Sequence, residues 1–353
     1  MTEGDIYPEL YFTQSHTSYC MVVQQPDQFA MIDNEGTIQI CDLNDTSNIS
    51  QKNVYTLPFS CDQYYSSDKQ PYIYGYALRE FEIINLQSGE INSFLPTYNG
   101  NSKICQIDIF SQAPFLLHID MVKFGWKEDV HTGYIYNPIE DTLIDTIENF
   151  QGELFLLPDN QKIIELFGDP PAHNKWSLSG DLKDFSKTNK LTEKLSTLGM
   201  RTWAISFNPN NHLMLGHTLI NDTLTNYSIK WDSTFDNIKI EPITYQFPED
   251  RIFSERFQFS SDGKWMRTVS SDTVDLDADY ITFFKIDQKY PQSISLPVYG
   301  TRSQIKSRGC FVETKTMGTV YIDVSEHYPG HLLVYKMSDV QNKIIEKMQK
   351  MMK

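Results

Sequence analysis

The chain has 353 residues, with 46 acidic and 30 basic side chains and a formal net charge of −16. This acidity disfavours direct binding to nucleic acid or to an anionic membrane, since both contacts need clustered Lys and Arg. The sequence shows neither a membrane-length apolar stretch nor a signal-peptide pattern, and its five cysteines form no Cys-x-x-Cys pair, so we expect a cytoplasmic protein without membrane contact.

A turn pattern recurs at intervals of about 40 to 55 residues along the chain. Each turn is rich in Asp, Asn, Ser or Pro, which favour tight turns, and lies between short runs of aromatic and β-branched residues, which favour strands. The turns are Pro26-Asp27, Ser67-Asp68, Ser111-Gln112, Pro158-Asp159, Pro209-Asn210, Ser261-Asp262 and Thr316-Met317. The clearest unit, residues 259–287, is typical of a strand, a tight turn, a second strand, a loop and a third strand.

A second pattern, an apolar residue followed by Asp or Asn, marks the expected end of a third strand. It occurs at Cys41-Asp42, Ile84-Asn85, Tyr136-Asn137, Trp231-Asp232 and Ile286-Asp287. Four strands in a repeat of about fifty residues predict the blades of a β-propeller. The seven predicted blades run from Tyr19 to about Pro58, from about Ser60 to Tyr98, from Ile104 to Ile147, from Gly152 to about Leu198, from Trp203 to Phe247, from Phe257 to Tyr299 and from about Arg308 to Met337.

The last blade lacks a fourth strand of its own, because the chain turns into a helix after Met337. We expect the missing strand to be Glu9 to Gln14, which would close the ring and cover an otherwise exposed strand edge. The fold class is therefore all-β: a seven-bladed β-propeller over residues 1–337, closed by an N-terminal strand, followed by a short C-terminal α-helix over residues 338–353.

The Trp231-Asp232 dipeptide at the end of a third strand resembles the signature of WD-repeat proteins, which also close their ring with an N-terminal strand. Over roughly residues 9 to 337 the chain resembles a divergent WD-repeat seven-bladed propeller. The resemblance implies a rigid platform whose loops carry the function.

Sequence motifs for catalysis, metal binding or cofactor binding are missing, so we predict no catalytic residue, no metal site and no cofactor. Four cysteines, Cys20, Cys61, Cys105 and Cys310, share one position early in the innermost strands of neighbouring blades. A soft-metal or redox cluster is one interpretation, and we favour packing as small buried side chains. We interpret the carboxylates at Asp272, Asp275, Asp277 and Asp279 as a solvated acidic loop rather than a calcium site.

Basic residues recur just before the first strands of several blades, at Lys103, Arg201, Arg251 and Arg302. They are expected to form an arc on the rim of the upper face, which carries the loops between second and third strands and between blades. With Phe124 and Trp126 from a nearby loop, this arc would bind an acidic surface of a protein partner. The alternative is local ion pairing with carboxylates such as Glu249 and Asp250.

The C-terminal residues 338–353 predict an amphipathic helix capped by Ser338 or Asp339. Its apolar residues are Val340, Ile344, Ile345, Met348 and Met352, and its lysines are Lys343, Lys347, Lys350 and Lys353. We expect the apolar face to dock on the propeller, the alternative being a contact with a partner.

These observations favour a non-catalytic scaffold or adaptor that binds protein partners through the upper face of the propeller. The alternative is a propeller enzyme or a small-ligand-binding protein with its site at the central opening, because such sites are assembled from distant blades and leave no local motif.

Overall fold

The structure is a computed structural model in which most of the described residues lie in β-strands. It describes residues 9–12, 17–24, 26–33, 35–45, 48–57, 61, 63–67, 70–77, 80–94, 102–109, 117–123, 130–138, 140–148, 153–156, 162–167, 172–177, 186–187, 205–208, 213–220, 223–231, 238–243, 251–253, 258–272, 279–286, 292–297, 309–324 and 331–351. The helix within these residues is neither long enough nor apolar enough to cross a membrane.

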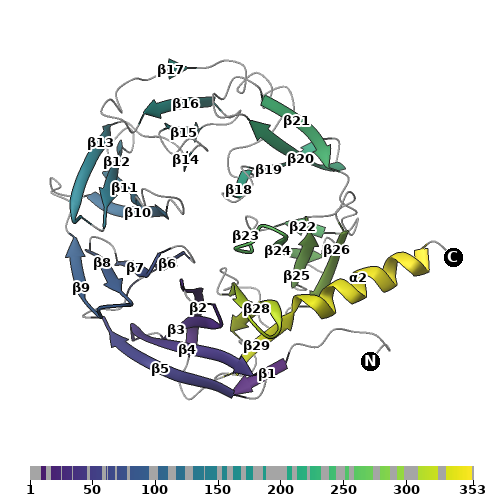
Figure 1. The fold of residues 1–353 in the computed structure, drawn as a ribbon. Helices are drawn as coiled ribbons and strands as arrows, with labels where there is room; N and C mark the ends of the chain where they lie inside the picture. The colour runs from purple at the N-terminus through teal and green to yellow at the C-terminus, as the bar shows by residue number, and fades with distance from the viewer. Residues whose placement is uncertain are drawn as a thin grey trace. The chain divides into compact units, whose positions relative to one another are not determined.

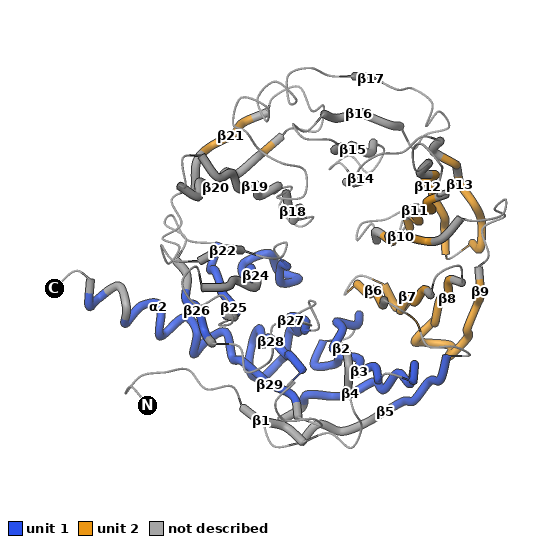
Figure 2. The backbone as a smooth tube through the Cα atoms, turned by 180° about the vertical axis from the view of Figure 1, so that it is seen from behind, with its two compact units in different colours: residues 1–60, 244–353 blue, residues 61–243 orange. Residues whose placement is uncertain are grey.

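The chain divides into two compact units, drawn in blue and orange in Figure 2. Unit 1 comprises residues 1–60 and 244–353, and unit 2 comprises residues 61–243. In both units the strands form small antiparallel sheets, and strands that follow one another in the chain pair side by side (Figure 1). Such meanders form readily because each pairing closes a short loop.

The described residues of unit 1 form three sheets and the C-terminal helix. One sheet has β2 (Thr17–Val22), β3 (Gln28–Asp33), β4 (Thr37–Asp45) and β5 (Asn48–Thr56). The next has β22 (Arg251–Phe253), β23 (Gln258–Phe259), β24 (Trp265–Asp272), β25 (Asp279–Lys285) and β26 (Gln292–Pro297). The third has β27 (Cys310–Thr314), β28 (Gly318–Val324), β29 (His331–Lys336) and β1 (Glu9–Phe12), and the helix is α2 (Met337–Met351).

The described residues of unit 2 form four sheets of four strands each. The first has β6 (Gln63–Ser66), β7 (Tyr72–Ala77), β8 (Glu80–Asn85) and β9 (Ile91–Phe94). The second has β10 (Ser102–Ile109), β11 (Leu117–Lys123), β12 (Val130–Asn137) and β13 (Thr142–Glu148). The third has β14 (Glu153–Leu156), β15 (Lys162–Phe167), β16 (Ala172–Ser177) and β17 (Ser186–Lys187). The fourth has β18 (Ile205–Asn208), β19 (Leu213–Ile220), β20 (Thr223–Trp231) and β21 (Ile238–Ile243).

The N-terminal strand β1 pairs antiparallel with β29, with Glu9 opposite Val334 and Phe12 opposite His331. The last sheet therefore takes its outer strand from the other end of the chain. This is the pairing that the sequence predicted for residues 9–14, of which the structure describes residues 9–12. The pairing satisfies the edge of β29, which would otherwise present a row of open backbone groups.

The turn between β23 and β24 forms as the Ser-Asp-Gly sequence predicted. The Ser260 hydroxyl accepts a hydrogen bond from the Trp265 N–H at 2.9 Å and donates one to the Asp262 carboxylate at 2.7 Å. The same carboxylate accepts the Lys264 N–H at 3.0 Å. Gly263 has a φ of +69°, which a residue without a Cβ adopts at little cost.

Two strand boundaries differ from the sequence expectation. The third strand of the first blade does not end at Asp42 but continues through β4 to Asp45, with irregular pairing at two points along β5. Asp42 is buried within the strand, so its carboxylate does not mark a turn. In the sheet of β22–β26, the first strand begins earlier than expected, because Arg251 in β22 already pairs with β24. β23 pairs with the same strand, and residues 254–257 between β22 and β23 lie outside the described residues.

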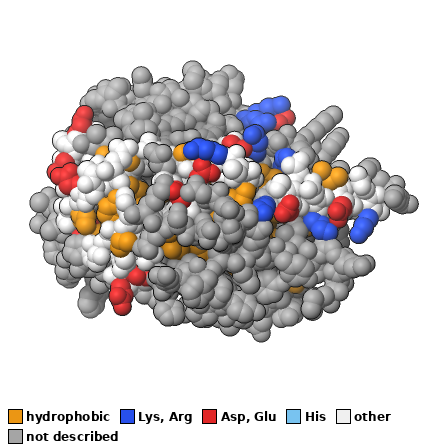
Figure 3. Space-filling model, turned by 60° about the horizontal axis from the view of Figure 1, so that its bottom comes forward, with side chains coloured by type: hydrophobic (Ala, Val, Ile, Leu, Met, Phe, Trp, Pro, Cys, Tyr) orange, Lys and Arg blue, Asp and Glu red, His pale blue; other side chains and the backbone are white. Residues whose placement is uncertain are grey.

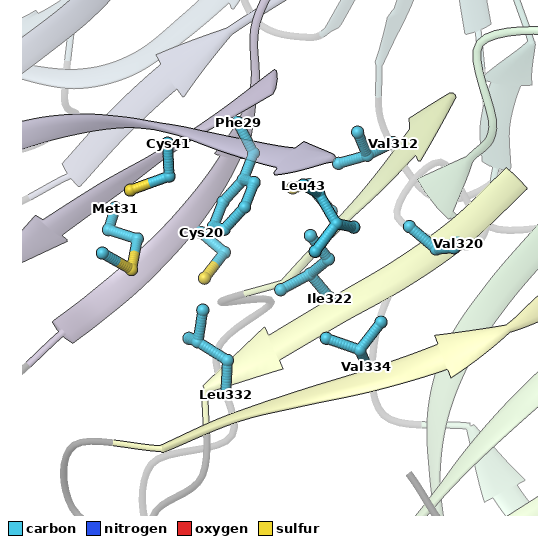
Figure 4. Close-up of a cluster of buried hydrophobic side chains, with 11 residues drawn as sticks. Cys20, Phe29, Met31, Cys41, Leu43, Val312, Val320, Ile322, Leu332 and Val334 are labelled. Atoms are coloured by element: carbon cyan, nitrogen blue, oxygen red, sulfur yellow. The ribbon is translucent and has the colours of Figure 1, made fainter. Parts of the chain in front are cut away.

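The core of unit 1 lies between neighbouring sheets. Figure 4 shows side chains of β2, β3 and β4 meeting those of β27, β28 and β29 in one buried cluster. Its members are Cys20, Phe29, Met31, Cys41, Leu43, Cys310, Val312, Val320, Ile322, Leu332 and Val334. In unit 2, a cluster rich in Tyr, Phe and Ile fills the space between the β6–β9 and β10–β13 sheets. Burial of such apolar surface is the main favourable term in folding.

Candidate interaction surfaces

The structure describes the backbone of two predicted rim residues, Lys103 and Arg251. Lys103 is the second residue of β10 and lies opposite Val122, near the end of β11. Arg251 is the first residue of β22 and lies opposite Asp272, the last residue of β24. Both residues therefore lie inside a first strand and not just ahead of it, because the paired second strand extends that far.

Lys103 and Arg251 occupy the same end of their respective sheets. In each case this is the end at which the second strand passes to the third, which defines the upper face in the sequence prediction. The other predicted rim residues, Arg201, Arg302, Phe124 and Trp126, lie outside the described residues. In the acidic loop, Asp272 and Asp279 end β24 and begin β25, while Asp275 and Asp277 also lie outside the described residues.

Helix α2 docks on unit 1 through its first two turns. Met337, Val340 and Ile344 are buried, and they pack with residues of β24 to β29. Those residues are Trp265, Ile281, Phe283, Leu296, Phe311, Tyr321, Leu333 and Tyr335. The expectation that the helix docks on its own domain is confirmed for this half of α2.

The second half of α2 is more open to solvent. Ile345 is 38% exposed, and Glu346 and Lys350 are also exposed. The Lys343 ammonium lies 3.0 Å from the Glu346 carboxylate, one turn further along the helix. In Figure 1 this half extends past β26 toward the C-terminus. The side chains described after Ile344, those of Ile345, Glu346, Gln349 and Lys350, are all exposed.

The described cysteines are buried free thiols. Cys20 and Cys310 belong to the same core cluster as Cys41, and burial is the main cause of the raised pKa of each thiol. In unit 2, a Cβ on Gly75 would lie 2.5 Å from the Cys61 sulfur, so the glycine leaves room for that thiol. Raised pKa values disfavour the reactive thiolate, and these contacts agree with packing. Cys105 lies at a bulge in β10, and its side chain is outside the described residues.

A buried arginine, which the sequence did not single out, links two sheets of unit 1. Arg267 on β24 is 1% exposed, its Nε donates to the Gln258 side-chain oxygen at 2.8 Å, and its guanidinium lies 5.4 Å from the centre of the Tyr321 ring. Gln258 in turn donates to the Gly309 carbonyl at 3.2 Å. The strand pattern around Arg267 gives no sign of these contacts, because Tyr321 and Gly309 come from a remote part of the chain.

No family model matches the sequence, and no curated protein is significantly similar to it. Among solved structures, the chain is similar to the β-propeller domain of Cps50 (Swd1) from Myceliophteria thermophila, with a TM-score of 0.51. The two chains are 9% identical, and the match covers 92% of this chain and 98% of that domain.

The fold is a β-propeller. Its four-stranded antiparallel sheets are the blades, and α2 follows the last of them. This confirms the propeller fold that the resemblance at Trp231-Asp232 implied. At 9% identity the likeness concerns the fold and does not extend to partners.

Proposed function

We propose that this propeller is a non-catalytic scaffold that binds an acidic surface of a protein partner at the upper ends of its blades. One observation supports the proposal: Lys103 and Arg251 each lie near the start of a first strand, at the end of their own sheet where the second strand passes to the third, in a chain with a net charge of −16. Basic residues repeated near the start of first strands would give an acidic partner several similar contacts.

The proposed surface also includes Arg201, Arg302, Phe124 and Trp126, and the complete ring is proposed to have seven blades closed by β1. Arginine suits an acidic partner because its planar guanidinium binds a carboxylate through two hydrogen bonds. Aromatic side chains beside it would supply the apolar contact area typical of binding hot spots. Loops on a rigid sheet scaffold are where such surfaces commonly lie.

Local ion pairing is the competing explanation, and the register makes it specific: Arg251 is directly opposite Asp272. Opposite charges on facing strand positions stabilise a sheet by roughly 0.2–1 kcal/mol. Under this explanation, Arg251 serves its own blade and no partner. Replacing Asp272 would then slightly lower the free energy of unfolding. If Arg251 instead binds a partner, replacing Asp272 should leave the free energy of unfolding unchanged and alter binding.

The test is a triple charge reversal, Arg201→Glu, Arg251→Glu and Arg302→Glu, in the full chain. We expect proteins captured from the source cell by the wild type to be lost by this variant, and the wild-type capture to weaken with salt. The matched control reverses three exposed lysines, Lys239, Lys264 and Lys315, which lie at the opposite ends of their sheets. Equal capture by the triple variant and the control would refute the rim as the binding surface.

A further inference from the structure

The outer strand β13 of unit 2 exposes two apolar side chains that follow one another in the chain. Leu143 is 47% exposed and Ile144 is 43% exposed. In a regular strand successive side chains point to opposite faces, so one of the two would be expected to pack against the blade. Single hydrophobic side chains at the surface are ordinary, and Figure 3 shows some among polar ones. The adjacent pair on β13 instead forms a small apolar patch.

A bulge in β13 accounts for the double exposure. Tyr136 on β12 pairs with Leu143. The preceding residue, Ile135, pairs with Asp145, so Ile144 is an extra residue of β13 at this point. A bulge re-aims side chains and interrupts their alternation between the two faces. All described side chains of β13 are exposed: Thr142, Leu143, Ile144 and Thr146.

The backbone of β13 forms an edge of its sheet. The strand order is β10-β11-β12-β13, and among the described residues β13 pairs with β12 alone (Figures 1 and 2). Alternate residues of an antiparallel edge strand direct their N–H and C=O groups away from the sheet. A further strand can pair with these groups. The apolar patch therefore lies on a backbone edge that can form hydrogen bonds.

The turn that leads into β13 is held in place and carries acidic side chains. The Tyr136 hydroxyl donates a hydrogen bond to the Asp141 carboxylate. The Asn137 side-chain oxygen accepts the Glu140 N–H at 3.2 Å. Glu140 and Asp141 are both exposed, and residues 140–148 contain four carboxylates and no Lys or Arg. The edge is therefore negatively charged, and an edge already held in place loses little conformational freedom on binding.

The charge of this edge selects the strand that it can add. Two copies of β13 paired with each other would bring carboxylates together, and like charges on facing strands are destabilising. A strand in which Lys or Arg alternates with apolar residues would meet opposite charge and cover Leu143 and Ile144. The edge is therefore suited to a basic partner strand rather than to a second copy of this chain.

We propose that β13 binds an extended, basic segment of a protein partner, which pairs with it as a further strand of the sheet. Main-chain hydrogen bonds supply affinity in this mode of binding, and the side chains along the edge supply specificity. The edge is separate from the proposed rim, and its partner has the opposite charge. Either proposal can therefore fail without the other.

The test uses the full chain and a fluorescent synthetic peptide of about ten residues, the length of a long strand, in which Val alternates with Lys. We expect saturable binding by fluorescence anisotropy at about 0.15 M salt, which screens distant charges. A second peptide has the same side chains and charge, with every peptide nitrogen methylated. It cannot donate hydrogen bonds to the edge, so it should bind about tenfold or more weakly.

Variants of the chain locate the binding site. Leu143→Ser with Ile144→Ser should weaken binding by about tenfold or more, because the apolar contact is lost. Its control is Val54→Ser on the outer strand β5, where Val54 is 53% exposed, and this change should leave binding unaltered. Glu140→Lys should weaken binding by about threefold or more. Its matched control is Glu90→Lys, which reverses an exposed carboxylate in the turn before β9.

Thermal melting of each variant checks that the fold is retained, and the two peptides are compared on the unaltered chain, so that comparison does not depend on any variant. Absence of saturable binding, equal binding of the two peptides, or equal binding by the variants and their controls would overturn the proposal. So would dimerisation of the chain, measured by light scattering, that Leu143→Ser with Ile144→Ser abolishes, since the edge would then bind a second copy.

Discussion

The carboxylate of Asp27 accepts a hydrogen bond from the backbone N–H of Lys315 at 2.7 Å, across 288 residues of sequence. The Asp27 N–H donates to the Glu313 carbonyl at 2.8 Å, so the β2–β3 turn is held to the β27–β28 turn by two bonds. Asp27 also has a φ of +64°, a conformation that Asp tolerates better than most residues with a side chain. Through this contact, the first and last blades of the chain are joined within unit 1.

Replacing Asp27 by Ala should lower the free energy of unfolding by about 2–4 kcal/mol. The loss combines a hydrogen bond to a charged acceptor with strain at positive φ. Asp27→Asn should cost less, because Asn accepts the same bond and tolerates the same φ. Urea denaturation measures both. Lys315→Ala is the control. The Lys315 side chain is 75% exposed, so loss of its ion pair should lower the free energy of unfolding by about 0.5 kcal/mol or less. If Asp27→Ala lowered it by the same amount as Lys315→Ala, the structural role of Asp27 would be contradicted.

The adjacent isoleucines of α2 provide a matched test of its docking. Ile344 is 3% exposed in a core cluster and Ile345 is 38% exposed. Ile344→Ala should reduce stability by about 2–4 kcal/mol, because it leaves a cavity between the helix and the sheets. Ile345→Ala should reduce it by about 1 kcal/mol or less. Chemical denaturation compares the two, and similar losses would show that the helix does not dock as described.

Deleting residues 1–14 should expose the edge of β29, since β1 is its pairing partner. We expect increased light scattering on heating and a broader unfolding transition, because an open strand edge is a template for association. Deleting residues 1–8 is the control, since it leaves Glu9–Phe12 in place. If both truncated proteins melt like the full chain, β1 contributes nothing to the last blade.

The buried thiols should make stability fall at high pH. Burial raises the pKa of Cys41 from its ordinary value of 9.0 to about 12, and it also raises the pKa values of Cys20 and Cys310. Below pH 9 each thiol is protonated in both states, so stability does not change. Above pH 9 the unfolded thiols lose protons that the folded ones keep, so stability falls by up to about 1.4 kcal/mol per pH unit for each.

Urea denaturation at about pH 8 and about pH 10.5 measures this slope. Replacing Cys20, Cys41 and Cys310 by Ala should reduce the slope, at some loss of packing energy. A residual slope is expected above pH 10, because burial also raises the pKa of the Tyr74 phenol. An unchanged slope in the variant would show that the thiols do not titrate differently on folding.

Local patterns predicted local structure well where neighbouring residues decide it. Ser260, Asp262 and Gly263 build their turn from bonds within six residues of chain, and the sequence shows this directly. The pattern failed at Asp42, because an apolar residue followed by a carboxylate does not by itself fix where a strand ends. Pairing with β5 keeps Asp42 within the strand. The residues around Asp42 do not reveal this pairing, because strand formation depends on the partner strand as well as on local residues.

The candidate surfaces divide in the same way. Spacing alone placed Val340 and Ile344 on one face of a helix, because helical periodicity is a property of the local backbone. It could not say which strands the helix docks on, since that depends on how β26, β28 and β29 pack beside α2. For Lys103 and Arg251, spacing indicated a repeated place in the blade, and the register located it inside the first strand.

The sequence by itself determined the repeating four-stranded plan, the N-terminal strand of the last blade and the C-terminal helix, because these follow from periodicity, turn chemistry and alternation over a few residues. Tertiary structure alone decided the contact of Asp27 with Lys315, the burial of Arg267 against Tyr321 and the docking of α2 through Val340 and Ile344. Each of these joins residues far apart in the chain, and their energies depend on packing between sheets, which no local pattern encodes.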